Sequence, residues 1–118
     1  MCLALGVVMT NAGCPQATPP QDGEPGVVEV RIQVMAFVPA EVTITQGETV
    51  RWVNSDLVQH TATSGNPGDA DAGAIWDSGF LGRGASFEHT FGEVGEFTYF
   101  CQLHPTTMRD ARVIVQAQ

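Results

Sequence analysis

The sequence predicts an all-β protein built as a β-sandwich, and three observations support this. Residues 28–34 alternate between apolar and polar side chains, which is the period of a half-buried strand. Short apolar segments of the same kind recur along the chain, separated by turns rich in Gly, Pro, Asn and Asp. After residue 26 there is no long amphipathic helix pattern. With 118 residues, the chain is long enough for one such domain.

The first three expected strands follow one another with short connections. The first covers residues 28–34, and the next two are centred on residues 42–44 and 50–52, with a turn at Gln46-Gly47 between them. In each strand every second residue is apolar, so one face of each is expected to line the core.

The C-terminal half supplies three more strands. Residues 86–91 and 96–101 are predicted to form a hairpin around the connection 92–95, and residues 111–115 form the last strand. Cys101 ends its strand on the same face as two alternate aromatic residues. Its thiol is therefore expected to point into the core.

The N-terminal segment has the character of an export signal. Residues 1–14 are predicted to be the remnant of a signal peptide, whose apolar run is too short to span a membrane. They end in Thr10-Asn11-Ala12-Gly13-Cys14, which resembles a bacterial lipobox with Cys14 as the lipidated residue, although Asn11 departs from the usual apolar residue. Ordinary export with cleavage nearby is the alternative. We expect an exported prokaryotic protein, either periplasmic or anchored on the outer side of the cytoplasmic membrane.

The linker and the folded domain follow. Residues 15–26 are polar and rich in Pro, so they are expected to form an extended tether without a core. Residues 27–118 are expected to form the folded domain. Cys101 is the one cysteine of that domain, so no disulfide can form within it. Coordination to a metal, away from water, would explain why an exported protein keeps an unpaired thiol.

The overall charge restricts the partners of the protein. Acidic residues outnumber basic ones by 13 to 5, with a net charge of -8, and no Lys is present. This balance argues against binding to nucleic acid or to an anionic membrane surface. It suits docking to a basic protein surface, and it equally suits simple solubility.

One short segment carries a metal-binding pattern. Cys101, His104 and Met108 lie in the spacing C-x-x-H-x-x-x-M, and His60 lies upstream beside an apolar segment. A thiolate, two imidazoles and a weak thioether make up the ligand set of an electron-transfer copper site. The pair C-x-x-H alone is weak evidence, because a buried Cys beside a surface His gives the same pattern.

Further segments strengthen the copper interpretation by resemblance. Roughly residues 27–117 resemble the cupredoxins, specifically the small plastocyanin-like and halocyanin-like blue copper proteins. The segments that carry the resemblance are Phe37-Val38-Pro39, residues 47–54, His60-Thr61, residues 86–91 and residues 95–101. The resemblance implies a Greek-key β-sandwich or barrel. It also implies one type 1 copper ion with the ligands His60, Cys101, His104 and Met108.

The spacing of the predicted axial ligand departs from the family. Three residues separate His104 from Met108, a spacing between those usual in plastocyanins and amicyanins, and Arg109-Asp110 follows where a small residue is common. Met108 is therefore the least secure ligand. Met35 is the competing sulfur, although a core or loop position is the more ordinary role for it.

The resemblance also implies roles for residues around the copper. The backbone N–H of Thr61 is expected to donate to the Cys101 sulfur. Asn54 is expected to tie the loop before His60, or to be simply a turn residue. His104, Pro105 and Leu103, with the Phe37-Val38-Pro39 loop, are expected to form an apolar electron port. His89, the remaining histidine, is expected on an exposed face or at a sheet edge.

These residues predict a one-electron carrier and not an enzyme. The chain has only three His, too few for the trinuclear cluster of a multicopper oxidase. The alternative is a periplasmic copper-binding protein or chaperone that passes on the ion itself. We expect a monomer whose partners are redox proteins, with a lipid anchor as its contact with the membrane.

Overall fold

A computed structural model describes residues 26–118. The predicted signal remnant, Cys14 and residues 15–25 of the predicted linker lie outside the described residues. Within the described part of the chain, no helix is long and apolar enough to cross a membrane.

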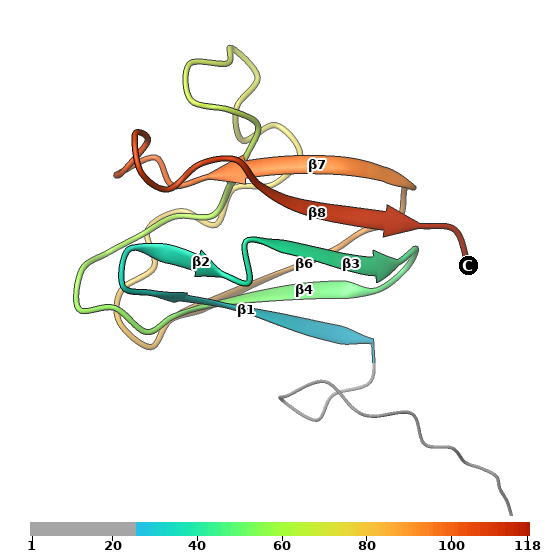
Figure 1. The fold of residues 1–118 in the computed structure, drawn as a ribbon, viewed down its shortest axis with the longest axis horizontal. Coiled ribbons are helices and arrows are strands. Elements are labelled where there is room, and N and C mark those ends of the chain that lie inside the picture. The colour runs from blue at the N-terminus through green and yellow to red at the C-terminus, as the bar shows by residue number, and fades with distance from the viewer. Residues whose placement is uncertain (1–25) are drawn as a thin grey trace, which may run out of the picture.

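The domain is a sandwich of two four-stranded sheets (Figure 1). One sheet has the order β2-β1-β4-β6 and the other has the order β3-β8-β7-β5. The prediction of an all-β sandwich is confirmed. The strands are β1 (Val27–Gln33), β2 (Ala36–Val38), β3 (Glu41–Thr45), β4 (Thr49–Asn54), β5 (Thr63–Ser64), β6 (Ser86–Thr90), β7 (Gly95–Phe100) and β8 (Ala111–Gln116).

The chain crosses between the sheets several times. β1 pairs in parallel with β4, and β3 pairs in parallel with β8, whereas the other neighbours are antiparallel. The predicted turn at Gln46-Gly47 is present, and it takes the chain from β3 in one sheet to β4 in the other. Gly47 has a φ of 95°, a backbone conformation that favours glycine.

The predicted hairpin of residues 86–91 and 96–101 is wrong. β6 pairs with β4 in one sheet, and β7 pairs with β8 and β5 in the other. The connection between β6 and β7 therefore crosses from sheet to sheet. The alternation of side chains predicts which face of a strand is buried, but it does not specify the partner strand. A connection of four residues is long enough both for a hairpin within one sheet and for a crossing between the two sheets.

The core between the sheets is rich in aromatic rings. Trp52 on β4 is fully buried and stacks on Trp76 with ring centroids 5.4 Å apart and planes 23° apart. Tyr99 on β7 meets Trp52 edge-on at 5.4 Å and Phe37 at 4.7 Å. These are the favourable geometries for aromatic pairs, and they add to the hydrophobic gain of burial. The cluster packs the two sheets against each other beneath β7, the strand that directly precedes Cys101.

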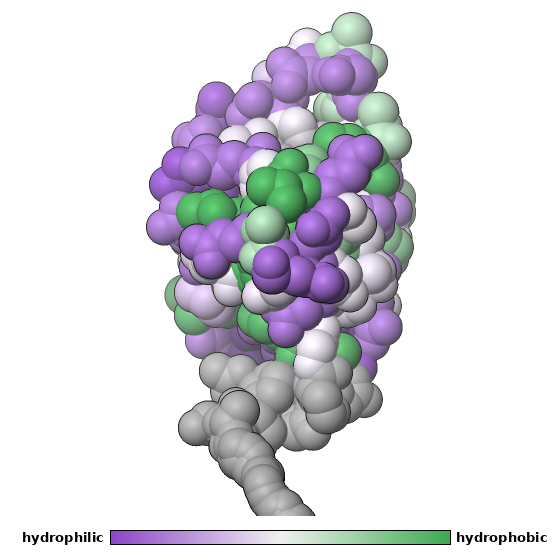
Figure 2. Space-filling model, turned by 90° about the vertical axis from the view of Figure 1, so that its right-hand side faces the viewer, coloured by the Kyte–Doolittle hydropathy of each residue, from purple (hydrophilic) through white to green (hydrophobic). Residues whose placement is uncertain are grey.

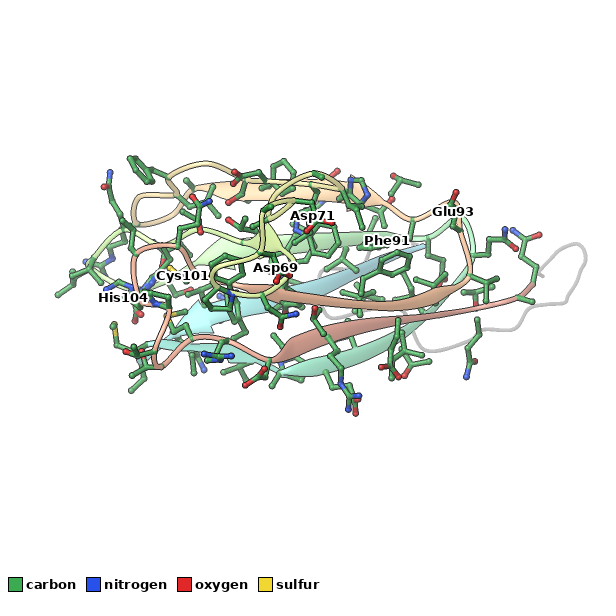
Figure 3. All side chains as sticks on the ribbon, turned by 90° about the horizontal axis from the view of Figure 1, so that it is seen from above. Asp69, Asp71, Phe91, Glu93, Cys101 and His104 are labelled. Atoms are coloured by element: carbon green, nitrogen blue, oxygen red, sulfur yellow. The ribbon has the colours of Figure 1, made fainter. Side chains whose placement is uncertain are left out.

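The two ends of the sandwich differ in their chemistry. Cys101 and His104 lie together at one end, and Phe91 and Glu93 lie at the other (Figure 3). Figure 2 looks at the end away from Cys101, where hydrophilic residues surround separate hydrophobic spots. The metal-binding pattern therefore occupies one end of the domain.

Candidate metal centre

A compact loop brings Cys101 and His104 together. Cys101 follows β7 directly and is fully buried. Its backbone N–H donates to the carbonyl of Met108 at 2.9 Å, and the N–H of His104 donates to the carbonyl of Cys101 at 3.2 Å. The N–H of Met108 in turn donates to the carbonyl of His104 at 2.9 Å. These bonds hold the three residues of the C-x-x-H-x-x-x-M pattern in one closed turn.

His60 reaches the same place from a distant part of the chain. It is fully buried, and its backbone exchanges two hydrogen bonds with Leu81, at 3.2 and 2.8 Å. Asn54, also fully buried, donates through Nδ2 to the carbonyls of Leu81 at 2.7 Å and Val58 at 3.0 Å. Its Oδ1 accepts the N–H of Asp56 at 2.9 Å. Asn54 therefore holds the loop that carries His60.

Three metal-binding atoms converge at this point. The Cys101 Sγ lies 3.8 Å from Nδ1 of His60 and 3.5 Å from Nδ1 of His104. One ligand atom from each of the three residues lies within 4.8 Å of the other two. Met108 is 2% exposed, whereas Met35 is 39% exposed in the turn between β1 and β2. Burial on the ligand loop makes Met108 the better placed of the two sulfurs.

The protonation of His60 suits a metal at Nδ1. Its Nε2 lies 2.8 Å from Oδ2 of Asp56. The Nε2–H group donates a hydrogen bond to this carboxylate. The neutral ring therefore keeps its lone pair on Nδ1, the atom that faces the sulfur. The backbone N–H of Thr61 donates to the Cys101 Sγ at 3.3 Å. A buried cysteine sulfur between two imidazole nitrogens is a donor set that fits copper.

The sequence comparison places this geometry in a family. Residues 25–116 match the family described as copper binding proteins, plastocyanin/azurin family. The chain belongs to this family. The cupredoxin prediction is confirmed, and the domain carries a type 1 copper site at which His60, Cys101, His104 and Met108 cluster. A site of this type carries single electrons.

Related sequences and structures agree with this assignment. The chain is 34% identical to amicyanin from Paracoccus versutus over 82 residues, which are 66% of this chain and 58% of the relative. It is 33% identical to plastocyanin from Scenedesmus fuscus over 86 residues, 70% of this chain and 88% of the relative. The chain thus spans little more than half of the amicyanin sequence.

Solved structures show the same fold. The crystal structure of amicyanin from Paracoccus versutus has a TM-score of 0.64 and 30% identity, covering 80% of this chain and 86% of that chain. A purple cupredoxin from Nitrosopumilus maritimus has a TM-score of 0.64 and 28% identity, covering 75% of this chain and 98% of that chain.

A buried hydrogen-bond chain supports the copper-site loop of this cupredoxin. The N–H of Gln102 donates to Oγ1 of Thr61 at 2.9 Å, and the Thr61 hydroxyl lies 2.9 Å from that of Thr63. Thr63 donates to Oδ1 of Asp77 at 3.1 Å. Because the Thr63 proton goes to Asp77, the Thr61 hydroxyl must donate to Thr63. These hydrogen bonds therefore all point in one direction, from the N–H of Gln102 on the ligand loop to the carboxylate of Asp77.

Sequence reasoning missed Asp56, Thr63 and Asp77. Asp56 lies four residues before His60, and this spacing is the one signal that could have identified it as a partner for the imidazole. Burial disfavours the ionised form of Asp56, but the N–H groups of Met35 and Val34 and the ring of His60 outweigh this effect. The pKa of Asp56 is therefore lowered from its ordinary value.

Apolar side chains are exposed on the ligand loop and on β2. Leu103 and Val38 are each 42% exposed, and His104 and Pro105 are half-buried. Phe37 does not belong to this surface, because its side chain is buried against Tyr99. An open groove of about 320 Å³ lies in the same region, lined by Met35, Ser55, Asp56, Leu57 and Val58.

His89 lies apart from the copper cluster. It is on the edge strand β6, where its ring stacks on Trp76 with centroids 5.4 Å apart and planes 27° apart. Burial lowers the pKa of His89 from its ordinary value of 6.5. Its role in the described structure is packing.

Proposed function

We propose that the protein is a one-electron carrier that exchanges electrons with redox proteins outside the cytoplasm. Copper, when bound, supplies a centre that alternates between Cu(II) and Cu(I). The observation that carries the proposal is the buried Sγ of Cys101, 3.8 and 3.5 Å from the Nδ1 atoms of His60 and His104.

Each ligand has a proposed role in this site. Cys101 would hold the ion through its thiolate, His60 and His104 through their Nδ1 atoms, and Met108 would supply a weak thioether. Hydrogen bonds hold His60 and the ligand loop in place through the protein alone. A site formed in advance changes little between the two oxidation states, which favours rapid electron transfer. Buried ligands also make release of the ion slow, which argues against a chaperone.

We propose that electrons enter and leave at the apolar surface around His104. Leu103 and Pro105 flank the half-buried His104 in the sequence, Val38 is exposed on β2, and none of these side chains carries a charge. A partner can approach such a surface without burying an unpaired charge. The acidic residues elsewhere on the protein steer basic partners during the encounter.

We propose further that a lipid on Cys14 tethers the domain to a membrane. The support is the sequence alone, from the resemblance of residues 10–14 to a lipobox and the Pro-rich composition of residues 15–26. Mass spectrometry of the membrane fraction from a bacterial host, given a complete signal peptide, tests this. Soluble protein with an unmodified Cys14 would reject the anchor.

Optical and EPR spectra of the copper-loaded protein, followed by redox titration, test the proposed carrier. We expect an intense charge-transfer band in the oxidised protein and a reversible one-electron titration. Cys101→Ser should lose the band and keep the β fold, because only Cys101 supplies a thiolate in the described domain. An intense band in the Cys101→Ser protein would refute the assignment of the ligand.

A further inference from the structure

The turn between β1 and β2 is strained. Val34 and Met35 are its two central residues, between the paired positions Gln33 and Ala36, and their φ angles are 53° and 57°. Two positive φ angles characterise the type I′ hairpin turn, which favours Asn-Gly and disfavours a β-branched residue such as Val. Val34 is also 86% exposed, so packing does not hold it in this conformation.

One carboxylate holds this turn. The N–H of Val34 donates to Oδ1 of Asp56 at 2.7 Å, and the N–H of Met35 donates to Oδ2 at 2.9 Å. The Asp56 side chain is only 16% exposed, and its backbone N–H is fixed by Asn54. A charged acceptor makes these hydrogen bonds stronger than neutral ones.

The same carboxylate also holds the copper ligand. Oδ2 of Asp56 lies 2.8 Å from Nε2 of His60, so three donors converge on two oxygens. Met35 and Asp56 both line the groove near the copper site. The Val34-Met35 turn and the His60 ring are therefore connected through a single side chain.

We propose that Asp56 is a positioning residue that fixes the His60 ring and the Val34-Met35 turn with one carboxylate. The proposal rests on the proposed function in that His60 is a copper ligand and the turn borders the partner surface. Through Asp56, displacement of the turn by a partner alters the hydrogen bond at His60. No other side chain in the described residues makes hydrogen bonds to both the turn and His60.

Asp56→Asn tests the shared role. The amide of Asn offers one oxygen as an acceptor, and its NH₂ group cannot accept from any of the three donors. We expect hydrogen exchange of the Val34 and Met35 amides to become about tenfold faster or more, because a hydrogen bond to a charged group is lost. NMR of reduced, copper-loaded protein should also show faster exchange of the His60 Nε2 proton. Asp71→Asn, on an exposed loop, is the matched control and should change neither.

A second variant separates the effect of Asp56 on the turn from its effect on His60. Val34→Asn with Met35→Gly gives the turn its preferred residues, so the turn no longer needs Asp56. Added to Asp56→Asn, these changes should keep the hairpin paired at Gln33 and Ala36, read from cross-strand NOEs, but leave the two turn amides and the His60 proton exchanging fast. Recovery of slow exchange at the His60 proton would overturn the direct contact, and unchanged exchange at either place in Asp56→Asn would overturn the shared role.

The wild-type protein provides a test that needs no variant. ¹⁵N shifts of metal-free protein should show that the neutral His60 ring carries its proton on Nε2, where it exchanges slowly. A neutral His60 ring with its proton on Nδ1 would overturn the proposal. This readout does not depend on electron transfer, so it stands apart from any failure of the carrier function.

Discussion

The hydrogen-bond chain through Thr61 should make a measurable contribution to stability. Thr61→Val keeps the shape of the side chain but removes the hydroxyl, which accepts from Gln102 N–H and donates to Thr63. Thr61 is fully buried, so water cannot readily replace these partners. Thr63 still donates to Asp77 in the variant.

The expected cost follows from these two bonds. Each contributes about 1 kcal/mol net, and the Gln102 N–H loses its acceptor, so we expect a loss of about 2 kcal/mol in the free energy of unfolding. For a domain of this size, that corresponds to a Tm lower by roughly 10 °C. The Thr61 N–H still donates to Cys101, so the charge-transfer band should keep its position.

The assay is urea unfolding of metal-free protein, so that copper binding does not contribute to stability. Thr43→Val is the matched control, because Thr43 is exposed on β3 and the same change there should stay within about 0.5 kcal/mol. If Thr61→Val unfolds at the same urea concentration as Thr43→Val, the buried chain does not stabilise the fold. A shifted absorption band would mean that the hydroxyl, and not only the backbone, acts on the sulfur.

Four further variants test other features of the protein. Met108→Leu should keep copper and raise the reduction potential, because the thioether donates weakly to Cu(II); an unchanged potential in redox titration would show that Met108 is not axial. Pro105→Glu and Val38→Glu should each slow electron exchange with a physiological partner in stopped-flow measurements and leave the spectrum unchanged, whereas rates equal to wild type would exclude this surface as the port. His89→Gln should reduce the loss of stability as the pH falls below the ordinary pKa of 6.5. Because burial lowers the folded pKa of His89, the unfolded chain takes up the proton first, so stability is full above the ordinary pKa of 6.5 and is lost as pH falls through the folded pKa. Unfolding titrations of wild type and variant at each pH would contradict this if their difference stayed constant.

The sequence determined the features that depend on short spacings. Period-two alternation was enough to predict six of the eight strands, because a strand at the core must bury one face, whereas β2 and β5 are too short to show the pattern. Cys101, His104 and Met108 lie on one loop, so their spacing already brought a thiolate, an imidazole and a thioether together. The resemblance to the cupredoxins then supplied His60, which lies far from this loop in the sequence.

Only the tertiary structure decided which distant segments meet. β6 and β7 are adjacent along the chain, yet they pair in different sheets, because strand partners depend on the packing of the whole core. Phe37 was expected at the surface, but its side chain is buried in the aromatic core, where it contacts Tyr99. Asp56 reaches back 22 residues to Val34 and forward four to His60, and no local pattern encodes a contact of that range. Short-range periodicity follows from backbone geometry, whereas a shared hydrogen-bond acceptor exists only once the chain has folded around it.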